Sequence, residues 1–105
     1  MLDYTKREKK VLPVTLINGK TVLLTAPKKA LYQKLTTLKA NLEGSSDFGQ
    51  LYDEILQLTA DVLSSNKTGA KFTVEDVDEL MDIEDMALLI FEYSKYAGQL
   101  IGNPN

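Results

Sequence analysis

One short stretch of this sequence, FTVEDVDELMDIEDM at residues 72–86, holds the side chains best suited to chemistry. Its seven acids in fifteen residues could bind calcium or supply a pair of catalytic carboxylates. A calcium loop needs oxygen ligands at positions one, three and five, glycine at six and glutamate at twelve. Counted from Asp76, positions five, six and twelve are Leu80, Met81 and Ala87. The stretch therefore does not fit a calcium loop.

Two successive helix starts account for the same acids. Thr73 and Asp76 have the spacing of a capping box, in which each side chain bonds the backbone N–H of the other residue. Asp82 and Asp85 repeat this spacing nine residues later. Acids in a first turn also face the positive end of the helix dipole. We therefore predict that a short helix leads directly into a long one and that the acids face solvent. The predicted helices span about residues 74–81 and 83–101.

Composition excludes several other chemistries. The chain has neither cysteine nor histidine, which rules out disulfides, thiol nucleophiles, Cys/His zinc sites and imidazole bases. The segment INGKT, residues 17–21, resembles the end of a phosphate-binding loop, but it lacks the earlier glycine and precedes a strand pattern. We expect no enzymatic activity, no catalytic or metal-binding residue, no cofactor and no small-molecule substrate.

Length and hydropathy indicate the class of protein. A chain of 105 residues is long enough for one domain with one core. Its longest apolar run, residues 86–91, is far shorter than the roughly 20 residues that span a membrane. No apolar segment follows the charged start MLDYTKREKK, so we expect no signal peptide. We predict a cytoplasmic protein that is not associated with a membrane.

The sequence pattern predicts a mainly α (α+β) fold, a small bundle of three to four helices with an N-terminal β-hairpin. Asn18-Gly19 between two β-rich runs predicts a two-residue type I′ turn that pairs Ile17 with Lys20. Both faces of such a hairpin are apolar, so the pattern alone leaves the register open. A lone ribbon is marginal in water, and it must pack on helices or pair with another chain. Pro13 favours an edge position for the first strand.

Two further helices complete the predicted bundle. The first, about residues 27–43, carries a leucine stripe and is expected to end at Gly44 in the left-handed conformation. The second begins at its cap Asp47 and ends near Leu63, before a polar loop that pivots at Gly69. The stripe consists of Leu31, Leu35, Leu38 and Leu42. As a single domain of residues 1–105, the chain divides into a mobile basic arm, the hairpin and the bundle, at residues 1–10, 11–25 and 27–101.

The long last helix has more apolar surface than one stripe requires. Leu88, Leu89 and Phe91 widen the seam that runs from Ile83 to Leu100 at helical spacing. Such a helix is either central in the bundle or part of an interface. Its side chains could fill the core of the monomer or contact a partner. The candidate partner-binding residues are Met86, Leu89, Ile90, Tyr93, Tyr96, Ala97 and Leu100.

Charge is distributed unevenly along the chain. Residues 1–40 hold nine basic and two acidic residues, a net charge of +7, whereas residues 41–105 hold three and thirteen, a net charge of −10. This asymmetry suits a homo-oligomer, an oppositely charged partner, or two halves that fold onto each other. The alternative function is a small nucleic-acid-binding or regulatory protein that uses the basic half, although only one arginine is present. The basic residues concerned are Lys6, Arg7, Lys9, Lys10, Lys28, Lys29, Lys34 and Lys39.

The order of these parts resembles a known family. A basic arm, a short strand pair around NGK, a Lys/Leu helix after proline and the segment FTVEDVDELMDIEDMALLIF are similar to the tail assembly chaperones of long-tailed (siphovirus-type) bacteriophages and prophages of Gram-positive bacteria. The resemblance spans nearly the whole chain, in pattern and length. It implies a small helical protein of the host cytoplasm. The implied partners are the tape measure protein, which the chaperone coats, and the tail tube subunits that it helps to recruit.

Overall fold

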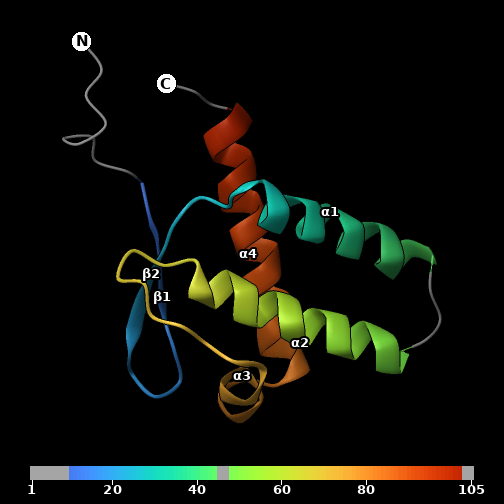
Figure 1. Cartoon of the computed structure of the whole chain (residues 1–105), viewed down its shortest axis with the longest axis horizontal. Helices are drawn as coiled ribbons and strands as arrows, with labels where there is room; N and C mark the ends of the chain where they lie inside the picture. The colour runs from blue at the N-terminus through green and yellow to red at the C-terminus, as the bar shows by residue number, and fades with distance from the viewer. Residues whose placement is uncertain (1–9, 45–47, 103–105) are drawn as a thin grey trace.

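The computed structural model describes residues 10–44 and 48–102 and shows the predicted mainly α (α+β) fold (Figure 1). The described residues form a two-stranded antiparallel hairpin and four helices. The ends of the helices agree with the predicted ends to within about two residues. The predicted cap Asp47 and all but the last residue of the predicted basic arm lie outside the described residues. The elements are β1 (Leu12–Thr15), β2 (Thr21–Leu24), α1 (Lys29–Gly44), α2 (Phe48–Ser64), α3 (Val74–Leu80) and α4 (Ile83–Gly102).

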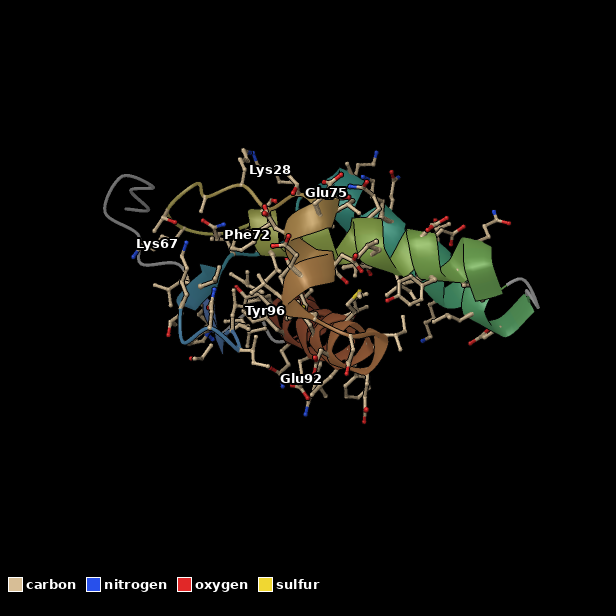
Figure 2. The ribbon with its side chains drawn as sticks, turned by 90° about the horizontal axis from the view of Figure 1, so that it is seen from below. Lys28, Lys67, Phe72, Glu75, Glu92 and Tyr96 are labelled. Carbon is tan, nitrogen blue, oxygen red and sulfur yellow. The ribbon has the colours of Figure 1, made fainter. Side chains whose placement is uncertain are left out.

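Helix α2 is the centre of the fold. It packs against α1, α3, α4 and β2. Figure 1 shows α1 and α2 running alongside each other, with α4 crossing them steeply, and Figure 2 shows α4 as a separate layer. The apolar positions of α2 recur at helical spacing, so one broad face of the helix is buried. The buried side chains of α2 are Leu51, Ile55, Leu58, Thr59, Ala60, Val62 and Leu63.

The hairpin loop differs from the predicted one. The backbone N–H of Leu16 donates to the carbonyl of Lys20, and that of Gly19 donates to the carbonyl of Leu16, each at 2.8 Å. A type I′ turn needs positive φ at both central residues, but Gly19, at φ +86°, is the only loop residue with positive φ. The prediction of a two-residue turn is therefore wrong. The loop has three residues, and the Asn18 side chain stabilises it by accepting a hydrogen bond from the backbone N–H of Lys20.

The longer loop shifts the strand register by one residue. Leu12 pairs with Leu24, and Val14 pairs with Val22. Because side chains alternate between the faces of a strand, this shift places these four residues on one face with Leu16. That face is the buried one, and the opposite face carries Pro13, Thr15, Thr21 and Leu23. Ile17, in the loop, is 84% exposed.

The outer edge of β2 is covered by the same chain. The N–H of Thr25 donates to the carbonyl of Ser65, and the N–H of Lys67 donates to the carbonyl of Leu23, each at 2.9 Å. Gly69 has a φ of +79°, so its predicted role as the pivot of this loop is confirmed. Gly44, by contrast, is helical and has no positive φ, so the prediction of a left-handed helix end there is wrong.

Two buried tyrosines connect α4 to the N-terminal segment. The hydroxyl of Tyr93 donates to the carbonyl of Thr25 at 2.6 Å, and that of Tyr96 donates to the carbonyl of Lys10 at 2.7 Å. Their ring centroids lie 5.8 Å apart. In Figure 2, Tyr96 lies on the side of α4 that faces the hairpin. These hydrogen bonds fix both ends of the hairpin against α4.

Candidate functional site

The acidic stretch forms two helix caps. Thr73 Oγ1 accepts from the N–H of Asp76 at 3.2 Å, and Asp76 Oδ2 accepts from the N–H of Thr73 at 2.9 Å. Asp82 and Asp85 make the same reciprocal pair at 2.8 and 3.2 Å. Each pair satisfies backbone donors that a helix start leaves without partners. The predicted capping boxes are therefore confirmed.

The acids of this stretch are exposed, and the pKa of Asp76 is lowered. Hydrogen bonds from Thr73, first from its backbone N–H, hold the pKa of Asp76 below its usual value. A carboxylic acid that is to donate a proton near neutral pH needs the opposite change, usually through burial. Within residues 10–44 and 48–102, no three acids gather where they could hold a metal ion. Three of the acids, Asp76, Asp82 and Asp85, cap the starts of α3 and α4.

Most of the predicted partner-binding residues lie in the core. Met86, Leu89, Tyr93, Tyr96 and Ala97 are all buried in the folded chain. In this conformation they expose little surface to a partner, although Ala97 lines a groove between α1 and α4. The two remaining residues, Ile90 and Leu100, are partly buried and pack against the same core.

The apolar surface that α4 does expose lies on other residues. Leu88 is 61% exposed and Phe91 is 64% exposed. The sequence pattern placed both residues outside the buried seam, and this position was the signal that could have predicted their exposure. Tyr32 and Leu42 on α1 are also large and exposed, but their helix showed a single stripe and gave no such signal.

An apolar groove separates α1 from α4, and we refer to it as the α1–α4 groove. It encloses about 650 Å³. Ile55 of α2 forms part of its lining, beneath walls from α1 and α4. Phe91, Tyr32 and Leu42 are the large exposed apolar side chains among its lining residues. The other apolar lining residues are Leu35, Leu38, Ala87, Ile90 and Ala97.

The charged residues that line the α1–α4 groove are Lys39 on α1 and Lys95 on α4. Both side chains are exposed. In the described part of the chain, the salt bridge of α1 joins Lys34 to Asp61 at 2.8 Å, and neither groove lysine takes part in an ion pair. The groove therefore combines an apolar lining with positive charge on two of its walls.

A second hollow, of about 440 Å³, lies between β1 and the start of α4. Ile17 and Leu88 are its large exposed apolar residues, and Asp85 and Glu92 also line it. Figure 2 shows Glu92 on the outer side of α4, away from α2. We call this the hairpin–α4 hollow. Helix α4 thus separates two hollows with opposite charge at their borders.

The structure describes five of the eight basic residues proposed for nucleic-acid binding. Lys6, Arg7 and Lys9 lie outside the described residues. Lys34 is neutralised by Asp61, whereas Lys39 belongs to the apolar groove. Lys10, Lys28 and Lys29 are exposed as well, and direct nucleic-acid binding stays a prediction.

Comparison with known proteins adds no relative. No protein-family model, curated protein or solved structure matches this chain. Within the described residues, no helix is both long and apolar enough to cross a membrane. The resemblance to tail assembly chaperones stays a prediction from the sequence.

Proposed function

We propose that this protein is a non-enzymatic assembly chaperone that holds a helical segment of a partner protein in the α1–α4 groove. By its sequence resemblance, the partner is the tape measure protein of a long-tailed phage or prophage, and the site of action is the host cytoplasm. The observation that carries the proposal is an apolar groove that runs between two helices and includes Phe91, which is 64% exposed.

The shape of the groove supports binding of a helix. Amphipathic helices bind between two helices by placing apolar side chains at spacings of three and four residues into a hydrophobic groove. The lining residues of α1 run from Tyr32 to Leu42 and those of α4 from Ala87 to Gly98, so each wall is about 16–18 Å long. A partner helix of about three turns matches that length.

A second surface could serve the contacts that a chaperone makes besides the one with the tape measure protein. The hairpin–α4 hollow exposes Ile17 and Leu88 on the other side of α4. We assign it to contacts with tail tube subunits or with further copies of this chain. Sedimentation velocity over a range of concentrations, with Ile17→Ser as the variant, tests this assignment. Unchanged sedimentation and unchanged tube-subunit binding in the variant would refute it.

The test of the main proposal is solubility of the tape measure protein. Purified helical segments of that protein are diluted from denaturant with and without the chaperone, and aggregation is followed by light scattering. We expect the wild-type chain to suppress aggregation. Burying a phenylalanine side chain stabilises by about 1.5–3 kcal/mol, so we expect Phe91→Ser to weaken binding by roughly 10- to 150-fold and to lose the suppression.

Leu88→Ser is the matched control. It removes an equally exposed apolar side chain from α4, but one that lines the hairpin–α4 hollow instead of the groove. Both substitutions are at exposed positions and should change the free energy of unfolding by no more than about 0.5 kcal/mol. Equal loss of suppression in both variants, or no suppression by the wild-type chain, contradicts the proposal.

A further inference from the structure

The lining of the α1–α4 groove is basic, although the protein as a whole is acidic. The protein has a net charge of −3, and residues 41–105, which include α4, carry −10. Yet the charged residues that line this groove are two lysines, Lys39 and Lys95, from opposite walls. In the described residues, neither lysine has an acidic partner within the chain. The groove is thus a basic site in an acidic protein.

Two other hollows give the contrast, whereas a fourth, beside Phe72, has both lysines and acids in its lining. The hairpin–α4 hollow is lined by Asp85 and Glu92 and by no basic residue of the described chain. The hollow between α1 and α2 contains Lys34, but Asp61 pairs with it at 2.8 Å. Positive charge without an internal partner next to apolar surface is therefore a feature of the α1–α4 groove among these three.

We propose that the α1–α4 groove binds an amphipathic helix whose apolar stripe is flanked on both sides by acidic residues, and that Lys39 and Lys95 select this charge. This inference rests on the proposed function, because it specifies the chemistry of the helix that the groove holds. The apolar stripe contacts Phe91, Ile90 and Leu38, and each flank of the helix places a carboxylate near one lysine.

Apolar and charged contacts contribute differently to binding, which is the physical basis of the proposed charge selection. Apolar contact in the centre provides most of the affinity, whereas complementary charges at the border provide specificity and raise the association rate. An exposed ion pair changes affinity by about two- to fivefold, and salt weakens it because the Debye length is only about 8 Å at physiological ionic strength. Like charge at the same positions has the opposite effect.

The experiment uses three designed helical peptides that share one leucine stripe. Their flanking positions carry glutamate, glutamine or lysine, and each is fluorescently labelled for anisotropy titration against the full chain. We expect the glutamate peptide to bind most tightly and the lysine peptide most weakly, with about two- to fivefold between successive peptides for each flank. The differences should shrink as salt is added.

Protein variants assign the effect to the two lysines. Lys39→Glu and Lys95→Glu should each weaken the glutamate peptide by at least about fourfold and strengthen the lysine peptide. Lys67→Glu makes the same charge change in the loop near the hairpin, where Figure 2 labels it, and Lys67 does not line the groove. That control should leave the order of the peptides unchanged.

The outcomes separate the two proposals. If the three peptides bind with equal affinity and Phe91→Ser abolishes binding, the groove holds a helix but the inferred charge selection is wrong. If none binds, or if Phe91→Ser has no effect, the proposed function itself fails. If Phe91→Ser converts an oligomer to a monomer and peptide affinity falls as protein concentration rises, a second copy occupies the groove and the inference is overturned.

Discussion

The hydrogen bond from Tyr93 to Thr25 predicts a measurable loss of stability when the hydroxyl is removed. Tyr93 is fully buried, and its hydroxyl donates to the Thr25 carbonyl at 2.6 Å, between residues 68 positions apart. Tyr93→Phe retains the ring and leaves this carbonyl without that donor. A net hydrogen bond is worth about 0.5–1.5 kcal/mol, and an unsatisfied buried acceptor costs about 1–3 kcal/mol. Because Thr25 is only partly buried, we expect the free energy of unfolding to fall by about 1–2 kcal/mol.

Thermal and urea unfolding, followed by far-ultraviolet circular dichroism, measure this loss. For a domain of this size, 1 kcal/mol corresponds to about 4–8 °C, so we expect the Tm to fall by roughly 5–15 °C. Tyr32→Phe is the control, because Tyr32 is 42% exposed and its substitution should cost no more than about 0.5 kcal/mol. If Tyr93→Phe is as stable as the control, the hydroxyl does not hold the hairpin against α4 and the reasoning fails.

Three further predictions follow from caps, titration and backbone conformation. Burial raises the pKa of Tyr93 and Tyr96, so above the unfolded value of about 10 the native state retains protons that the unfolded chain releases. The free energy of unfolding should therefore fall as pH rises through this range, and it should fall less in the variant with phenylalanine at both positions. Urea unfolding at a series of pH values measures this dependence. Thr73→Ala should cost about 1 kcal/mol by removing a cap, whereas Asp78→Asn should change stability by no more than about 0.5 kcal/mol; equal effects in thermal unfolding would contradict the capping interpretation. Gly19→Ala should destabilise by about 1 kcal/mol because alanine is strained at φ +86°, and an unchanged Tm would show that the loop conformation is wrong.

Local signals in the sequence were sufficient for the helices. The capping spacing of Thr73 with Asp76 located the start of α3, and the same spacing located the start of α4. These signals work because a cap satisfies its own backbone within a few residues and depends little on the rest of the fold. Gly44 shows the limit of such reasoning. A glycine after a leucine stripe often ends a helix, but here the helical conformation includes it.

The register of the hairpin and the residues that line the groove could not be predicted from local sequence signals. Asn18-Gly19 is compatible with two loop lengths, and only packing of one face against the helices selects the register that buries Leu24. Helix α4 has an apolar seam and additional apolar residues beside it. The sequence interpretation assigned partner contacts mainly to the seam, most of which packs in the core. The periodicity of α4 separates the seam that includes Met86 from the additional apolar residues that include Phe91, but which set stays exposed depends on where α2 and α1 lie.

The central claim is that a helical partner binds between α1 and α4, and backbone amide chemical-shift mapping by NMR tests it most directly. A labelled chain is titrated with an acid-flanked helical peptide, or with a tape measure segment. The account predicts that the largest shifts occur at lining residues of both helices, including Leu38, Phe91 and Ser94, with little change near Ile17 and Leu88. Shifts concentrated around Ile17 and Leu88, or no shifts at saturating peptide, would contradict it.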